Sequence, residues 1–250
     1  MSVVKEFKGA IAFLTIFPTG EKSLSSAIDG MHYFPIVGAF IGFLTGVFNW
    51  LITRFLSGLL ASTFTIGFLL LITGLHHIDG LADFGDGIMA SGSKEDRWKA
   101  MHDVNIGVGG LILTVIIILS SIFAISQLTL NILIQSLIIS EVSAKLSMVF
   151  LALISKPVYE GLGASFIKGM RGKKGITKFF ISLVFSLAIA LLLLHFSGFL
   201  MLITGLLTAI IIFIISKKKF GGVTGDVFGA VNEVSRMASL ITVYWVVSWI

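Results

Sequence analysis

The chain has 250 residues, of which 56% are hydrophobic and only 12% are charged, and its formal net charge is +5. A soluble domain carries about twice that charged fraction, so the composition excludes an ordinary soluble enzyme. It predicts an all-α, polytopic membrane protein with one membrane-embedded domain over 1–250. The absence of cysteine excludes disulfides and thiolate metal sites. Basic residues lie mainly at the ends of apolar segments, where topology and anionic headgroups account for them, so no nucleic-acid partner is expected.

The apolar segments define the expected elements in chain order. A short run at 9–17, ended by Pro18, is expected to form an interfacial helix, because no small-residue cleavage site follows it. Seven later segments are long enough to cross about 30 Å of hydrocarbon. They lie roughly at 34–53, 55–76, 106–126, 128–154, 176–196, 198–216 and 226–250. Very short connections join the first six in pairs, so we expect three helical hairpins. Gly38, Gly42 and Gly46 recur every four residues and predict close helix packing on the first span.

This arrangement predicts the orientation of the chain. The long polar segments 1–33, 77–105, 155–175 and 217–225 all lie on one side of the membrane, and Arg54 is the only charged residue assigned to the other side. By the positive-inside rule, the side that carries the basic residues is cytoplasmic. We therefore predict a multi-pass protein of the cytoplasmic membrane, with its N-terminus and its active site facing the cytoplasm and its C-terminus outside.

The segment 73–110 is the most informative part of the chain. It places Asp79, Asp83 and Asp86 among small residues at the end of an apolar segment, although the whole chain has only thirteen acidic side chains. Helical spacing would bring these three carboxylates to one face, where their mutual repulsion calls for a cation. A solvated acidic loop is the alternative, but carboxylates next to lipid are costly and usually functional. The segment therefore indicates a metal or catalytic site.

Two further acidic sites lie within the apolar spans. Asp226 and Glu233 share one face of the last span with Gly229 and could approach the aspartates from the cytoplasmic side. Glu141 and Lys145 lie one turn apart within the fourth span, where a self-neutralising buried pair and a ligand contact are equally open.

A basic, glycine-rich segment lies at 155–175, between the fourth and fifth spans. Its Lys168 and Arg171 could bind phosphate groups, because such side chains pair with phosphate and glycine lets the backbone approach. A plain juxtamembrane loop fits the composition equally well.

These motifs together resemble the cobalamin synthase family. The family's hallmark reads approximately T-G-x-x-H-x-D-G-L-A-D-x-x-D-G, and it is filled here by Thr73, Gly74, His77, Asp79, Gly80, Leu81, Ala82, Asp83, Asp86 and Gly87. Further matches cover nearly the whole chain: F-L-T-x-x-P at 13–18, F-P-x-V-G at 34–38, G-L-G at 161–163 and G-G-V-T-G-D-V-x-G-A at 221–230. The chain departs from the family at Asn105, where many members have arginine, and at Lys145, where arginine is often found.

The resemblance implies a reaction, in which the cobinamide-phosphate group passes from its GDP-activated form to a ribose hydroxyl of α-ribazole or its 5′-phosphate, with release of GMP. It implies GDP-cobinamide, which is a corrinoid, and α-ribazole as partners beside the lipid bilayer, and it leaves a homo-oligomer open. An oxygen-rich ligand set favours Mg²⁺ as the cofactor. The metal ligands expected are Asp79, Asp83, Asp86, Asp226 and Glu233, and the catalytic candidates are Asp83, Asp86 and His77. The expected substrate contacts are Asp103, Asn105, Lys145, Lys168, Arg171, Thr224 and Asn232.

Two other functions remain open on the sequence. A CDP-alcohol-type lipid phosphotransferase has a similar aspartate-rich signature, but its usual arginine is replaced here by Asp83. A divalent-cation transporter would favour carboxylates spread through the membrane depth and an internal repeat. The aspartates gather instead near one expected interface, which favours the transferase.

Overall fold

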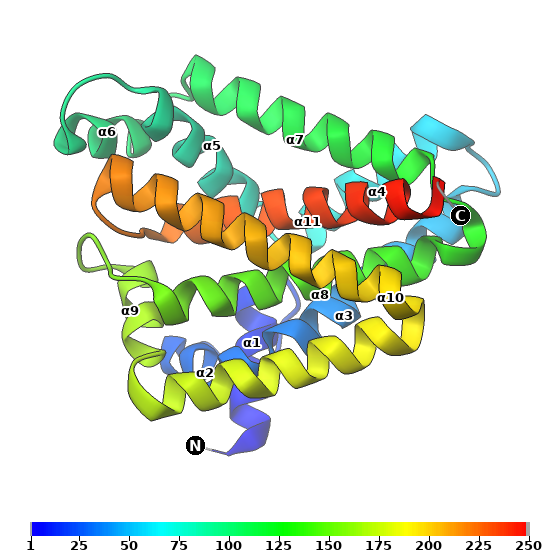
Figure 1. Cartoon of the computed structure of the whole chain (residues 1–250), viewed down its shortest axis with the longest axis horizontal. Coiled ribbons are helices and arrows are strands. Elements are labelled where there is room, and N and C mark those ends of the chain that lie inside the picture. Colours follow the sequence, from blue (N-terminus) through cyan, green and yellow to red (C-terminus); the bar gives the residue numbers. More distant parts are fainter. Residues whose placement is uncertain (1, 249–250) are drawn as a thin grey trace.

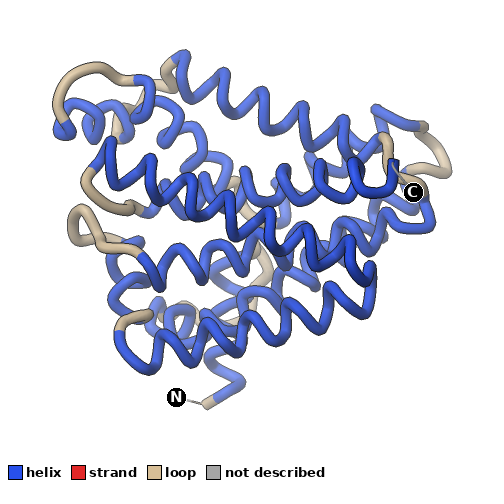
Figure 2. Tube along the Cα trace, viewed as in Figure 1, coloured by secondary structure: helices blue, strands red, loops and turns tan. Residues whose placement is uncertain are grey.

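Helices make up most of the molecule (Figures 1 and 2). The computed structural model describes residues 2–248, and within them the only extended pairing is an isolated bridge between Pro157 and Val223. The α-helices are α1 (Val3–Leu14), α2 (Leu24–Asp29), α3 (Phe34–Ile52), α4 (Gly58–Ile72), α5 (His76–Met89), α6 (Lys94–Met101), α7 (Val108–Ser126), α8 (Leu130–Ile154), α9 (Leu162–Gly169), α10 (Gly172–Phe220) and α11 (Gly225–Ser248). A 3-10 helix, η1 (Gly30–Tyr33), connects α2 to α3. The predicted all-α membrane bundle is confirmed.

Helices occupy all seven apolar segments, but not every one of these helices is long and apolar enough to cross a membrane. Four stretches of residues 2–248 are long and apolar enough: Leu24–Ile52, α7, α8 and α10. The bent pair of α4 and α5 adds a fifth if it counts as one span. Charged residues in the first half of α11, Glu233 and Arg236 among them, keep that helix outside this set. A multi-pass membrane protein follows, while the number of seven crossings stays a prediction.

Helix α10 contains two predicted spans back to back. Its backbone is non-helical at Leu194 and His195, and the chain folds back there (Figure 1). A side chain at Gly198 would run into the backbone of Ala190, so glycine is what lets the two arms close upon each other. The predicted hairpin with its connection near His195 is confirmed.

The second predicted span, 55–76, is shorter than expected. Helix α4 has 15 residues, which is about 22 Å and less than the hydrocarbon thickness. The chain then bends by 97° into α5. Gly74 (φ 73°) and Leu75 (φ 62°) make this bend in left-handed backbone, which glycine adopts readily and leucine rarely. The bend carries the aspartate segment away from the axis of α4.

The N-terminal helix also differs from its predicted bounds. It was expected at 9–17, with Pro18 as the stop, but α1 begins at Val3 because the Ser2 hydroxyl accepts a hydrogen bond from the Lys5 amide (3.4 Å). It ends at Leu14, where Thr15 turns extended and its hydroxyl donates to the Ile11 carbonyl (2.7 Å). The helix therefore stops before proline is reached.

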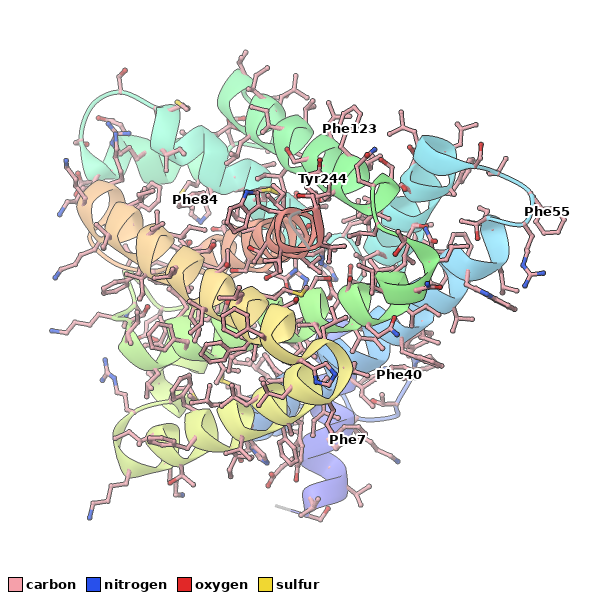
Figure 3. All side chains as sticks on the ribbon, turned by 45° about the vertical axis from the view of Figure 1, so that its right-hand side comes forward. Phe7, Phe40, Phe55, Phe84, Phe123 and Tyr244 are labelled. Carbon is pink, nitrogen blue, oxygen red and sulfur yellow. The ribbon has the colours of Figure 1, made fainter. Side chains whose placement is uncertain are left out.

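Helix α8 is the core of the bundle. In the most apolar 18-residue stretch of α8, 78% is buried inside the molecule, whereas the corresponding share for α7 is 33%. The predicted glycine packing on α3 is confirmed, since a Cβ at Gly38 would lie 2.7 Å from the Glu141 carbonyl and one at Gly42 would lie 2.5 Å from the Ile138 Cα. Aromatic side chains such as Phe55 and Phe123 instead project outwards and are exposed, as expected of a lipid-facing surface (Figure 3).

Candidate active site

The first turns of α5 and α11 bring the acidic residues together. A Cβ at Gly80 would lie 3.0 Å from the Asp226 Cα, and one at Gly229 would lie 2.7 Å from the His77 carbonyl, so two glycines allow the helices to touch. Asp79 and Asp83 lie on α5 on either side of Gly80 in the sequence, and Asp79 lines the same cavity as Asp226. Asp83 is within electrostatic range of Asp79, Asp86 and Asp226. The predicted approach of the last span to the aspartate segment is found at this contact.

Asp226 is held by its own helix end. It lies in the first turn of α11, where a carboxylate is stabilised by the helix dipole. The Thr224 hydroxyl donates a hydrogen bond to Asp226 Oδ2 (3.1 Å). Thr224 is buried and Asp226 is partly exposed. The structure thus places Thr224, an expected substrate contact, as a direct partner of an expected metal ligand.

Asp86 has a different set of partners from those expected. Its two carboxylate oxygens accept hydrogen bonds from the backbone amides of Gly107 (2.7 Å) and Gly110 (2.8 Å). These amides belong to the unsatisfied N-terminus of α7, so Asp86 acts as a cap for that helix from a neighbouring one. Helical spacing predicts that Asp86 shares a role with Asp79 and Asp83. It could not predict that the backbone amides of α7 would bind the Asp86 carboxylate instead.

An aromatic and histidine cluster borders Asp226, and no sequence motif predicts it. Tyr159 and His102 form a hydrogen bond (2.9 Å), and His102 Nδ1 lies 2.7 Å from the Trp98 carbonyl. Because a carbonyl only accepts, Nδ1 carries the hydrogen, and in the neutral imidazole the Tyr159 hydroxyl donates to Nε2. Burial raises the pKa of Tyr159 to about 12, so it remains protonated at neutral pH. His102, Tyr159, Thr224 and Asp226 line one open groove of about 190 Å³.

The carboxylates that meet here are compatible with Mg²⁺. Within residues 2–248, no three His, Asp or Glu side chains converge closely enough to hold an ion by themselves. Mg²⁺ is usually held by one or two carboxylates, with substrate phosphates and water completing its octahedron. Asp79, Asp83 and Asp226 offer carboxylate oxygens near one helix contact, and their mutual repulsion would be relieved by a divalent cation. The fit is to an ion shared with a phosphate-bearing substrate.

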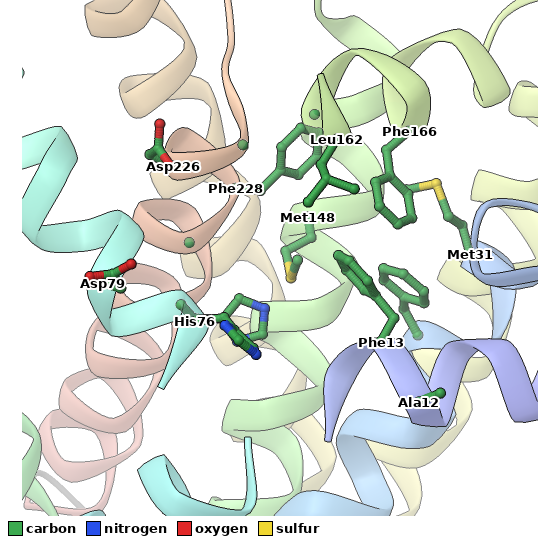
Figure 4. A pocket seen from close by; sticks show the side chains of 15 residues that line it. Ala12, Phe13, Met31, His76, Asp79, Met148, Leu162, Phe166, Asp226 and Phe228 are labelled. Carbon is green, nitrogen blue, oxygen red and sulfur yellow. The ribbon is translucent and has the colours of Figure 1, made fainter. Parts of the chain in front are cut away.

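A cavity of about 420 Å³ opens beside these carboxylates (Figure 4). Its polar lining consists of His76, His77, Asp79 and Asp226, and its apolar lining includes Phe13, Phe34, Phe166, Phe228, Met31, Met148 and Leu162. In Figure 4 the two aspartates lie on one side and Phe13, Phe166 and Met31 lie on the other. His77 is 7% exposed, and its Nδ1 atom has no hydrogen-bond partner. The cavity therefore has an acidic end and an aromatic end.

Glu233, Lys145 and Asn232 lie in a separate buried network. Lys145 donates to Glu141 and Asn232 (2.8 Å each). Arg236 pairs with both Glu141 and Glu233. All five side chains are at most 3% exposed, so burial demands these pairings. Glu233 is therefore an ion-pair partner of Arg236 rather than a neighbour of the aspartates. Arg236 was missed by the sequence reading, although its spacing of three residues from Glu233 on one helix is a recognisable pairing signal.

The remaining expected substrate contacts lie on the surface. Asp103 accepts hydrogen bonds from the Asn105 amide (2.9 Å) and Asn105 Nδ2 (3.1 Å), which lower the pKa of Asp103. Lys168 pairs with Glu160 (2.6 Å), and Arg171 is exposed beside it in the sequence. No hydrogen bond or ion pair within residues 2–248 joins these four residues to Asp79, Asp83 or Asp226. Their contact with substrate stays a prediction.

The protein is a multi-pass helical bundle in which carboxylates of two neighbouring helices lie beside a cavity. This combination defines a membrane protein with an enzyme-like site. Residues 6–244 match the family model described as cobalamin-5-phosphate synthase. The chain belongs to this family and is a transferase of the cobalamin pathway.

Similar proteins in several organisms share one name. A protein named adenosylcobinamide-GDP ribazoletransferase from Methanosarcina barkeri is 34% identical over 260 residues, covering 96% of this chain and 91% of the relative. Proteins of the same name from Methanococcoides burtonii and a Thermoanaerobacter species are 31% and 33% identical. These cover 92% and 96% of this chain and 88% and 97% of the relatives. No solved structure matches the chain.

Proposed function

We propose that the protein joins GDP-activated cobinamide to α-ribazole or its 5′-phosphate and releases GMP, as the family relatives' name indicates. A ribose hydroxyl oxygen attacks the phosphorus that carries cobinamide. A new P–O bond forms to the ribose, the bond from that phosphorus to the GMP oxygen breaks, and GMP leaves with the electron pair. The hydroxyl proton passes to a base in the site. Atoms and charge balance without any further reactant.

The observation that carries this proposal is the contact of α5 with α11 at the edge of the cavity. It offers Asp79, Asp83 and Asp226 to a diphosphate on one side and a ligand cavity on the other. Phosphoryl transfer relies on positioning and charge neutralisation more than on covalent chemistry by the protein. Mg²⁺ held by these carboxylates would neutralise charge on the diphosphate. Asp226 lines both the cavity and the open groove, so it lies where the two substrates would meet.

The general base belongs to the wall of the cavity. His77 and the carboxylates Asp79 and Asp226 line it. Any of these groups could take the hydroxyl proton, because a base must lie within hydrogen-bond reach of the proton it accepts. Asp86 is a weaker candidate, since both of its oxygens are engaged by the backbone of α7.

The proposed location is the cytoplasmic face of the cell membrane. The basic segments flank the helices on the side of the aspartates, which supports this orientation under the positive-inside rule. GDP-activated substrates and Mg²⁺ are available on that side.

Replacement of Asp83 tests the metal-assisted reaction. In the Asp83→Asn variant we expect Mg²⁺-dependent GMP release from GDP-cobinamide and α-ribazole to fall by at least about a hundredfold, with an unchanged melting temperature in detergent. Asp29→Asn is the matched control, because Asp29 lies on α2, away from the aspartates, and its half-exposed carboxylate pairs with Lys178 (3.6 Å). Full activity of Asp83→Asn rejects the role of this carboxylate. CDP-lipid offered in place of GDP-cobinamide should give no product, and turnover with it would favour a lipid phosphotransferase instead.

A further inference from the structure

We propose that the 420 Å³ cavity binds the aromatic base of the acceptor nucleoside, with its ribose at the acidic end. This inference rests on the proposed function and assigns one of its two substrates to one cavity.

The volume of the cavity selects the smaller substrate. Small-molecule sites are usually about 300–1,000 Å³, and 420 Å³ is near the lower limit of that range. A nucleoside fits such a space, whereas a corrin ring with its side chains is much larger. The corrinoid therefore has to remain outside, on the open side of Asp226.

The aromatic end of the cavity suits a flat ring. Phe13 and Phe34 are stacked, with centroids 5.9 Å apart and planes 17° apart. Phe166 stands tilted against Phe13 at 4.5 Å between centroids. Aromatic rings gain from offset and edge contacts with another ring beyond the area they bury. A guanine base would bring several donors and acceptors to this end, and the phenylalanine side chains there could not satisfy them.

The polar end distinguishes a nucleoside from a lipid chain. His77 lines the cavity, and a polar imidazole in such a wall normally has a hydrogen-bond partner. An acyl chain has no group to offer it, whereas a nucleoside has ribose hydroxyls. Asp79 and Asp226 lie at the same end (Figure 4). A base seated among the phenylalanines would thus direct its ribose towards the carboxylates where the transfer occurs.

Two substitutions in the lining test the assignment, one that shortens a side chain and one that lengthens a side chain. Phe166→Ala removes an aromatic wall, and Ala12→Leu fills part of the cavity from α1. We expect each to raise the KM for α-ribazole by about tenfold, while the KM for GDP-cobinamide changes less than about twofold. Phe48→Ala is the matched control, because Phe48 stacks on Phe68 (4.3 Å) and does not line the cavity. It should leave both constants unchanged. Melting temperatures in detergent identify any variant that fails to fold.

Equilibrium binding of α-ribazole, measured without GDP-cobinamide, separates this inference from the reaction itself. If wild-type protein binds α-ribazole but releases no GMP, the proposed function is rejected and the assignment of the cavity to α-ribazole stands. Unchanged α-ribazole binding in both Phe166→Ala and Ala12→Leu would overturn the assignment. A rise in the KM for GDP-cobinamide alone would also overturn it, because the cavity would then belong to the donor.

Discussion

Asp86 illustrates how one carboxylate of an acidic motif takes a role that its neighbours do not share. It lies three residues after Asp83 on the same helix, yet it accepts two backbone hydrogen bonds from the start of α7. A side chain at Gly107 or Gly110 would press upon the Asp86 carboxylate. The bare backbone of α7 is therefore what lets this cap form, and it anchors the aspartate helix to the next span.

Removing this cap should lower the stability of the protein and leave its affinity for Mg²⁺ nearly unchanged. We expect Asp86→Ala to reduce the free energy of unfolding by about 1–2 kcal/mol, the usual range for loss of a helix cap. The Mg²⁺ concentration for half-maximal activity should stay within about twofold of wild type, since the oxygens of Asp86 already have partners. Chemical unfolding in detergent and a Mg²⁺ titration of GMP release measure the two effects. An unchanged stability with a large loss of Mg²⁺ affinity would restore Asp86 to the metal ligands.

At the scale of helices, the candidate active site depends on the contact of α5 with α11. The contact needs glycine at two positions, because the backbones approach too closely for a Cβ. The carboxylates of the two helices meet only while this distance is kept. Packing and catalysis are therefore linked through residues that carry no functional group.

Adding a methyl group at this contact should separate the helices. In Gly229→Ala the new Cβ would lie 2.7 Å from the His77 carbonyl, and such overpacking usually costs about 1–3 kcal/mol. We expect lower stability and a fall in the rate of GMP release, because Asp226 shifts relative to Asp79. Gly67→Ala on α4 is the control, since nothing lies within 4 Å of its Cβ position. Equal activity in the two variants would show that the spacing of the helices does not matter.

The contact between α8 and α11 combines buried charges with a hydrogen bond between the hydroxyls of Ser239 and Ser143 (2.9 Å). Glu141 lies between Lys145 and Arg236, and Arg236 also neutralises Glu233. His77 lies close enough to this network to be affected by its charges. The charges of this network therefore reach the polar wall of the cavity, to which His77 belongs.

Loss of the arginine should destabilise the bundle strongly. Arg236→Met leaves Glu233 without an ion-pair partner and removes one from Glu141, and breaking a buried pair in this way typically costs about 3–5 kcal/mol. Arg171→Met is the control, because Arg171 is exposed. Unfolding in a denaturing detergent should occur much earlier for the first variant than for the second. Coincident unfolding curves would mean that the buried pairs contribute nothing to stability.

For the whole molecule, orientation is the property that links the site to its substrates. Arg54 lies in the turn between α3 and α4, with its guanidinium over the Trp50 ring (4.6 Å), while the lysine-rich end of α10 leads into α11. With seven crossings and a cytoplasmic N-terminus, the C-terminus lies outside. We therefore expect a reporter fused after the last residue to be active only in the external compartment, and one inserted between α5 and α6 to be active only in the cytoplasm. A cytoplasmic C-terminal reporter would reject seven crossings.

Much of the candidate site could be predicted from local sequence, and the reason is physical. Hydropathy and turn residues act over short distances along the chain, so the apolar segments became helices and the hairpin of α10 breaks at the predicted place. The acidic motif likewise predicts Asp79 and Asp83 as site residues, and the late glycine-rich motif at 221–230 predicts Asp226. Partners that lie far apart in sequence, such as Asp86 with Gly110 or Glu141 with Arg236, could not be assigned in this way.

The sequence alone determined that this is a helical membrane protein of the cobalamin synthase family, because composition and motif are properties of the chain itself. Only the tertiary structure decided which carboxylates meet, which one caps a helix and which ones neutralise a buried arginine. It also formed the cavity, whose walls come from α1, α3, α5, α8, α9 and α11. These outcomes depend on the bend at Gly74 and on close contacts at Gly80 and Gly229, where small backbone features set the distances between remote side chains.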